Sequence, residues 1–229
     1  WTNAVDEVKI GCNAKIHWVK LQHDSEKSAL TQHSKINQEK DSRAIVHTIS
    51  TGGKFLRNNL DFLLRGSGAE ARMFGLSLGS DKQLIDHHTR VDHLAPNCIS
   101  HEAYKGIFDD NSHGVFNGKI FVHLDAQKTQ AYQQNNNLVL SENATIDTKP
   151  QLEIFADDVK CSHGCTIGQL DEDALFYLRA RGIPIKEAKA LLMLAFANDA
   201  IADIQHPSLR AKLSELIGLN LGVDMSSAF

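Results

Sequence analysis

The sequence lacks the features that would place the chain in a membrane or on nucleic acid. No apolar run approaches the roughly 20 residues that a membrane helix needs, and the Lys and Arg residues form no long run. The formal net charge of −4 disfavours a nucleic-acid-binding surface. The N-terminus, from Trp1, has neither a basic start nor an apolar segment, so it is no signal peptide. Because it also lacks Met, we expect a region to be missing before it.

Cysteine is too sparse for a disulfide framework. The chain has four cysteines in 229 residues, at positions 12, 98, 161 and 165, whereas small secreted domains use dense cysteine pairs. Free thiols in a reducing cytoplasm are the simpler interpretation. Two catalytic motifs are also missing: there is no P-loop and no His-Glu-x-x-His. We therefore do not expect this chain to hydrolyse ATP itself.

Short alternating apolar runs dominate the chain up to Gly168. "GKIFVHLDA" places Ile120, Val122 and Leu124 on one face, and "QLEIFADD" does the same from Leu152. "LVLSENATID" predicts a further short strand. Glycine-rich turn signals separate these runs, and the stretch 114–118 is interpreted as one of them. Crossover helices have no room, so the pattern favours a β-sandwich, a barrel or a stacked solenoid.

One polar run favours the solenoid. "QAYQQNNNLVL" holds Gln and Asn residues where a strand is expected to begin, and amide side chains in stacked strands can bond along the stack. A polar loop explains the same run equally well, so both interpretations stay open. No repeat of fixed length is visible, so the periodicity signal that a β-helix usually shows is weak in this sequence.

After Gly168 the pattern becomes helical. A first helix is predicted from Asp171 to Gly182, with acidic residues at its start and glycine at its end. A second helix is predicted to begin at Pro184. A third is predicted from Pro207 or Ser208 to Gly218. We expect a β core over residues 1–168 and a small helical unit over residues 169–229.

The second predicted helix carries an apolar stripe at helical spacing. The stripe consists of Ala188, Leu191, Leu192, Ala195 and Phe196. It is interpreted as core, with a docking face for another protein as the alternative.

The stretch "ADDVKCSHGCTIG" concentrates soft metal ligands. In a strand, Cys161, His163 and Cys165 share one face, and thiolate with imidazole suits zinc, copper or an iron–sulfur centre. The three positions span about 13 Å along a strand, so they reach one ion only if Gly164 bends the chain. A buried structural thiol with a satisfied edge histidine is the simpler interpretation. A disulfide between Cys161 and Cys165 is disfavoured, since no Cys-x-x-Cys context is present.

Other polar groups are weaker candidates for a site. His87 and His88, with three neighbouring polar residues (Asp86, Asp92 and His93), are interpreted as solvated strand edges, because adjacent residues of a strand face opposite sides. His101 and Glu102 are also expected on opposite faces. The pairs 109–110 and 157–158 are aspartates at expected corners, and they are the only weak support for a β-helix enzyme acting on polysaccharide.

Residues 104–196 resemble the SufB/SufD family of iron–sulfur cluster assembly proteins, and SufD within it. The resemblance rests on "FNGKI", "AQKT", "TKPQLEI" with "ADDVKCSHG", and "GQLDE" followed by "LFYLRARGI". It is thin from Ala44 to Cys98, and nothing is carried over before Ala44. SufB relatives usually have a His-Glu-Ala-Ser type sequence where this chain has Ser162-His163-Gly164. Cys165 departs from SufD relatives, which more often have Ala there.

The resemblance implies a mainly β fold, a right-handed parallel β-helix with a small α-helical C-terminal unit. It implies a non-catalytic scaffold subunit that assembles a transient iron–sulfur cluster at an interface with a SufB-like subunit. His163 matches the histidine implicated in SufD, with Cys161 as its neighbouring thiol. Residues 171–204 match the part that docks a SufC-like ATPase, and an isolated chain is expected to form a homodimer. The alternatives are a zinc or copper binder using Cys161, His163 and Cys165, and the polysaccharide enzyme.

Overall fold

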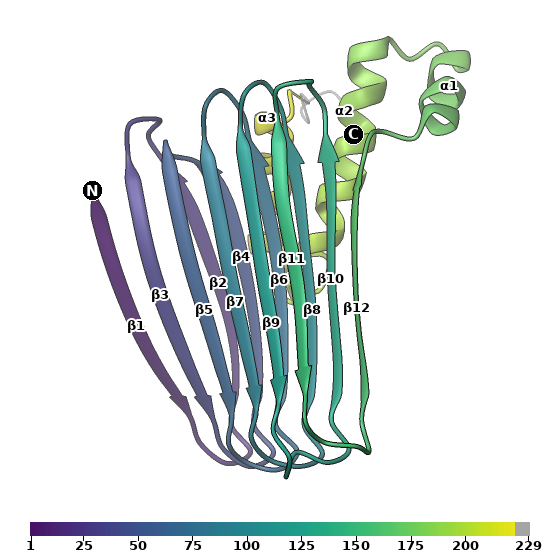
Figure 1. Cartoon of the computed structure of the whole chain (residues 1–229). Helices are drawn as coiled ribbons and strands as arrows, with labels where there is room; N and C mark the ends of the chain where they lie inside the picture. The colour runs from purple at the N-terminus through teal and green to yellow at the C-terminus, as the bar shows by residue number, and fades with distance from the viewer. Residues whose placement is uncertain (223–229) are drawn as a thin grey trace.

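Two parallel β-sheets face each other along most of the chain. The computed structural model describes residues 1–222, and its twelve strands alternate between the two sheets, so that the chain winds as a solenoid (Figure 1). The odd sheet contains β1 Thr2–Ile10, β3 Ala29–Gln38, β5 Phe55–Leu64, β7 Leu84–His93, β9 His113–Val122 and β11 Thr145–Ile154. The even sheet contains β2 Lys15–Asp24, β4 Arg43–Gly52, β6 Glu70–Gly79, β8 Ile99–Phe108, β10 Gln130–Val139 and β12 Lys160–Gly168. The predicted β-helix of stacked short strands is confirmed.

The helices follow the last strand, as the sequence predicts. They are α1 Glu172–Ala180, α2 Ile185–Asn198, the 3₁₀ turn η1 Asp199–Ile201, and α3 Pro207–Asn220. Asp171 caps α1, because its side chain accepts a hydrogen bond from the Ala174 backbone N–H. Pro184 is the N-cap of α2 rather than its first residue. Residues 223–229 of the expected helical unit lie outside the described residues, within which no helix is long and apolar enough to cross a membrane.

The coils of the solenoid differ in length, although their strands stay in register. Ala29 pairs with Phe55 in the odd sheet, and further along His113 pairs with Thr145. The extra residues of the longer coils lie in the corners, for example between β10 and β11. Variable corners therefore explain why no fixed repeat is visible in the sequence.

The corners that lead from the odd sheet to the even sheet contain residues with a left-handed backbone conformation. Asn13, Asp41, Asn97 and Lys128 have φ between 55° and 61°. The backbone N–H of each donates to a carbonyl of the following coil, on Lys40, Ser67, Gln127 and Asp158 respectively. Asn and Asp tolerate this conformation better than other non-glycine residues, which accounts for part of the Asn and Asp content of the strand region.

Two local predictions are wrong. The stretch 114–118 is not a turn but lies inside β9, and "LVLSENATID" spans the end of β10 and the start of β11. Gly118 is required for packing rather than for chain reversal: a Cβ there would lie 2.3 Å from Gln133 Nε2. Glycine in a strand marks such close approaches as well as turns, and the sequence does not distinguish the two.

The interior between the sheets combines an apolar core with buried polar residues. Phe62, Leu64 and Met73 are fully buried in the largest cluster. His87 and His93 are buried as well, at 2% and 0% exposure, so the prediction of solvated strand edges is wrong for them. His87 lies 3.3 Å from Ser50 Oγ and His93 lies 2.9 Å from Ser100 Oγ. These hydroxyl partners reduce the free-energy cost of burying the imidazole rings.

The helical unit packs on the outer face of the even sheet. Leu194 and Ala197 of α2 join Leu76 and Ile107 of the sheet in one buried cluster. The predicted apolar stripe of α2 is wrong in detail, because Leu191 is 38% exposed and Ala195 is also exposed. The buried face is turned toward Ala190, Leu194 and Ala197, since sheet residues such as Leu76 and Ile107 belong to the same core and set the rotation of the helix.

Lys105 on β8 fastens α2 to the sheet. Its Nζ donates to the carbonyl of Phe196 at 3.1 Å and to Asp199 Oδ2 at 2.6 Å, and it lies 4.4 Å from the centre of the Phe196 ring. A cation at a helix C-terminus interacts favourably with the last carbonyls. The strand and the end of the helix are therefore held at one point by three contacts.

We expect the protein to lose stability in mild acid. Burial lowers the pKa of His87 to about 3 and that of His93 to about 3, so both stay neutral in the fold while an unfolded chain protonates them near pH 6.5. The free energy of unfolding should fall as pH decreases below about 6.5, by up to about 1.4 kcal/mol per pH unit for each histidine. Urea unfolding between about pH 7 and pH 4.5 measures this slope.

The variant His87→Asn should make the dependence of unfolding free energy on pH shallower by about 1.4 kcal/mol per pH unit, which corresponds to one proton. The matched control is His33→Asn, which removes an imidazole from the outer face, where the side chain is 48% exposed. Equal slopes in the wild type and His87→Asn would contradict the lowered pKa that we assign to His87.

Candidate functional site

The last strand, β12, forms the C-terminal edge of the even sheet. It pairs with β10 on one side, and no described strand pairs with its other side. β11 is the corresponding edge of the odd sheet, so both sheets end at the same open coil (Figure 1). Free strand edges carry unsatisfied backbone groups that another chain can pair with.

Cys161, His163 and Cys165 share the inward side of β12. They pair in register with Ala131, Gln133 and Asn135 of β10, whose side chains are buried between the sheets. Residues in register on parallel strands point to the same face. No coil of the described part of the chain covers β12, so His163 and Cys165 are exposed and Cys161 is half-buried.

The three predicted ligands do not converge within this chain. β12 runs unbroken through Gly164, which stays paired with Gln134, so the bend that a single ion would require is absent. In residues 1–222, no three His, Cys, Asp or Glu side chains form a metal-binding group, and Cys161 and Cys165 are free thiols. The assignment of His163, Cys161 and Cys165 to a metal therefore stays a prediction.

Cys161 has a more protected environment than the other two residues. It packs against a cluster that includes Val122, Ala131 and Ala156. Burial raises the pKa of its thiol, and the Ala131 backbone partly offsets this effect. A raised pKa disfavours the thiolate, which is the form that binds metal. A change in its surroundings, such as the approach of a cation, would be needed to favour ligation.

A buried polar pair lies directly behind His163. Gln133, its register partner on β10, donates from Nε2 to Glu102 Oε2 of β8 at 2.6 Å. Gln133 Oε1 is buried and has no hydrogen-bond partner among residues 1–222. Burial raises the pKa of Glu102 to about 7. A carboxyl group that titrates near neutrality therefore lies two strands from the exposed imidazole.

The sequence does not single out this buried pair. The Gln and Asn run proves to be strand β10, with Gln133, Asn135 and Asn137 buried inside the stack. Asn135 donates to the Tyr104 carbonyl and Asn137 donates to Asn135 Oδ1, so amides do bond along and across the coils, and the polar-loop interpretation is wrong. Burial alternates along "QAYQQNNNLV", but the residue types do not, because amides occupy both faces of the strand. The run of Gln and Asn was therefore the only hint that the sequence offered.

Apolar side chains surround the open coil. Phe155, Ile167 and Leu124 are 59%, 53% and 68% exposed, and Ile154 is 40% exposed. Phe155 is supported by Phe121, with ring centres 5.2 Å apart. An apolar rim next to a free strand edge has the character of a protein interface.

α1 presents a second exposed apolar surface. None of its residues is buried, and Phe176 and Tyr177 are 74% and 58% exposed. The Arg181 guanidinium lies over the Tyr177 ring at 5.2 Å. Exposed aromatic residues together with Arg are the types enriched in protein interfaces.

The stacked coils and the helical unit after them define a parallel β-helix protein with helices at its C-terminal side. Residues 1–196 match the family model described as "SUF system FeS cluster assembly, SufBD core domain". The chain belongs to this family. The match begins at residue 1, so the family core extends over the N-terminal coils, where the sequence alone gave no resemblance.

Named relatives agree with this assignment. The chain is 35% identical to the iron–sulfur cluster assembly protein SufD of Escherichia coli, over 96% of this chain and 52% of that protein. It is 37% identical to the SufBD family protein slr0076 of Synechocystis, over 95% of this chain and 48% of the relative. It is 36% identical to the chloroplastic protein ABCI7 of Arabidopsis thaliana, over 92% of this chain and 44% of that protein. The chain spans about half the length of these relatives.

Gly118 should be needed to keep Gln133 in place behind the edge strand. In Gly118→Ala the new Cβ would lie 2.3 Å from Gln133 Nε2 and 2.8 Å from the Phe116 ring, so the amide must move away from Glu102. We expect a loss of about 1–3 kcal/mol in the free energy of unfolding. The matched control is Gly164→Ala on β12, where a Cβ meets nothing within 4 Å, with an expected change within about 0.5 kcal/mol. Equal effects in urea unfolding would contradict the packing argument.

Proposed function

We propose that this chain is the core of a SufD-like scaffold subunit in a SUF iron–sulfur cluster assembly complex. The observation that carries the proposal is the family match over residues 1–196, combined with the position of His163 on the uncovered edge strand. The subunit would be non-catalytic and would hold a nascent cluster rather than a resident cofactor. A cytoplasmic location stays a prediction, since one relative is a chloroplastic protein.

His163 would supply one ligand to a cluster that a SufB-like partner completes. A single exposed imidazole on a strand edge cannot hold an iron site alone, but it can offer a nitrogen across an interface. Cys161, two residues away on the same side of β12, is the second candidate ligand, and Cys165 is the third. The apolar rim around Phe155 and Ile167 would be covered by the partner, which would exclude water from the cluster. In an isolated chain the same edge would support a homodimer.

The helical unit would dock a SufC-like ATPase through residues 171–204. α1 has no buried side chain to constrain its surface, whereas the buried face of α2 is occupied by the even sheet. Phe176 and Tyr177 therefore form the surface that we assign to the ATPase. Movement of the docked ATPase would be transmitted through α2 to the β-helix.

Replacing His163 should reduce cluster formation without dissolving the complex. We expect the assembled complex of His163→Ala to hold several-fold less iron and acid-labile sulfide than the wild type, with an unchanged subunit ratio in size-exclusion chromatography. The matched control is Ser162→Ala, which changes the adjacent, outward position of β12. Unchanged cluster content in His163→Ala would reject the role of this residue.

Phe176 and Tyr177 should be needed for capture of the ATPase. Deleting residues 171–204 is a poor test, because it would expose Leu76 and Ile107 of the even sheet. The double variant Phe176→Asp, Tyr177→Ser leaves that core intact. We expect it to lose co-purification with a SufC-like ATPase while keeping the midpoint of urea unfolding.

The matched control for the ATPase test is Leu219→Ser on α3, which removes an apolar residue that is 66% exposed. This control should leave ATPase binding unchanged. Retention of the ATPase by the double variant would place the docking surface elsewhere.

A further inference from the structure

A polar cavity lies between the first coils of the described stack, far from His163 on its last strand. It has a volume of about 330 Å³ and is walled by β1 to β5 from both sheets. Trp18, Leu30 and Leu56 provide apolar walls, and Lys20 and Gln22 of β2 are among its polar lining residues. Its size is at the lower end of the range for small-molecule sites.

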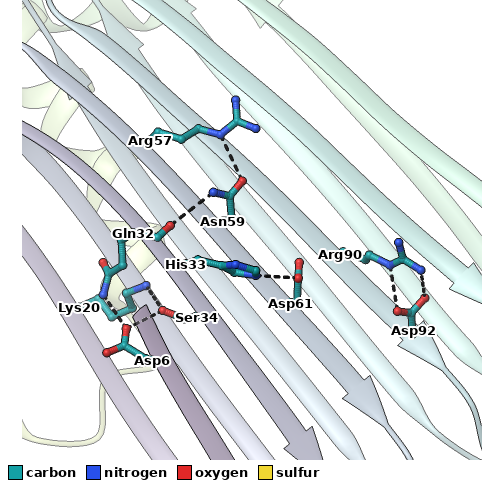
Figure 2. Close-up of polar contacts among 10 residues, drawn as sticks. All are labelled: Asp6, Lys20, Gln32, His33, Ser34, Arg57, Asn59, Asp61, Arg90 and Asp92. Carbon is teal, nitrogen blue, oxygen red and sulfur yellow. Dashed lines mark hydrogen bonds and ion pairs between the residues drawn. The ribbon is translucent and has the colours of Figure 1, made fainter. Parts of the chain in front are cut away.

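Lys20 gives the cavity a buried cation. The residue is 9% exposed, and its Nζ donates to Ser34 Oγ and to Asn58 Oδ1, both at 2.9 Å (Figure 2 shows the Ser34 contact). An ammonium group has three donors, so one N–H is left over from these two bonds. Burial lowers the pKa of Lys20 to about 8, although Asp6 partly opposes this effect. The ammonium therefore lies in a site that only partly compensates its charge.

Asp6 does not neutralise Lys20 directly. Ser34 Oγ and Gln32 Nε2 both donate to Asp6 Oδ2 at 2.8 Å, so the carboxylate is connected to the ammonium through the serine hydroxyl (Figure 2). Asp6 is not one of the residues that line the cavity. The side of Lys20 that faces the cavity is consequently open to an additional anion.

Gln22 adds an acceptor without a partner. Its Nε2 donates to Asp24 Oδ2 at 3.0 Å and to the Gly52 carbonyl at 3.3 Å, and these bonds fix the amide. The residue is only 9% exposed. Its Oε1 is buried and accepts no hydrogen bond from the described residues. A buried polar atom left without a partner is unfavourable, and a donor brought by a ligand would satisfy it.

We propose that this cavity binds a small hydroxycarboxylate. Lys20 and Gln22 are two positions apart on the same face of β2, roughly 6.6 Å along the strand, which suits a ligand of about three carbons. The carboxylate accepts from Lys20 Nζ, and the hydroxyl donates to Gln22 Oε1. Asp24 lies at the exposed rim, and its Oδ2 is already bonded to Gln22. The carboxylate of the ligand therefore lies deeper in the cavity, against the Lys20 ammonium. A free small acid and an acidic side chain of another polypeptide segment share the carboxylate that Lys20 would bind.

Tryptophan fluorescence tests the proposal. The chain has two tryptophans, and Trp1→Phe leaves Trp18 in the cavity wall as the only reporter. Sodium glycerate is titrated into this variant, with glycerol as the uncharged control. A saturable change in Trp18 emission is expected for glycerate and none for glycerol. A triglutamate peptide forms the second arm, and a response to the peptide alone assigns the carboxylate to a polypeptide source.

Two substitutions in the Trp1→Phe background locate the binding site. Lys20→Met should weaken carboxylate binding by at least about tenfold, since it removes a charge-assisted hydrogen bond. Gln22→Glu should weaken it as well, because it places a negative charge beside the ligand, and it keeps the test available if Lys20→Met does not fold. Lys9→Met, on the 75% exposed side chain of β1, should leave binding unchanged. The proposal is overturned if neither carboxylate gives a saturable response, or if folded Lys20→Met binds as tightly as its parent.

Discussion

The parallel register between successive coils is the constraint on which the rest of the structure depends. Each inward side chain of one coil lies beside the inward side chain of the next coil in the same sheet, because parallel strands that stay in register repeat their facing pattern. Trp18, Val46, Met73, Glu102 and Gln133 form one such row, and His163 is its last member. A shift of one residue in any strand would move its inward side chains to the outer face and its outward side chains into the interior.

The same register makes the two ends of the solenoid chemically different. At the N-terminal coil the inward rows begin with Trp18, Lys20 and Gln22, which bound a polar cavity. At the C-terminal coil they end with His163 and Cys165, which lie on an uncovered strand beside an apolar rim. The interior between these ends is closed by packed aromatic, aliphatic and amide side chains. The first and the last described coils thus present different side chains.

Much of the architecture could be predicted from the sequence, because period-two runs and helix caps are local signals. The runs around Ile120 and Leu152 and the cap at Asp171 correspond to β9, β11 and α1. Burial of His87 and the rotation of α2 could not be predicted, since both depend on which residues another coil or sheet places opposite them. Gly118 shows the same limitation: the chain does not reveal that Gln133 occupies the volume of a side chain there. For the site, the shared face of Cys161 and His163 was predictable, but Glu102 and Gln133 behind them were not.

The attachment of α2 determines where a mechanical load would enter the β-helix. α1 packs mainly against α2, and the far end of α2 is fastened to β8 by Lys105. β8 is separated from the edge strand by β10 alone. Tension applied to α1 would therefore be delivered first to β8, two strands from His163 in the same sheet.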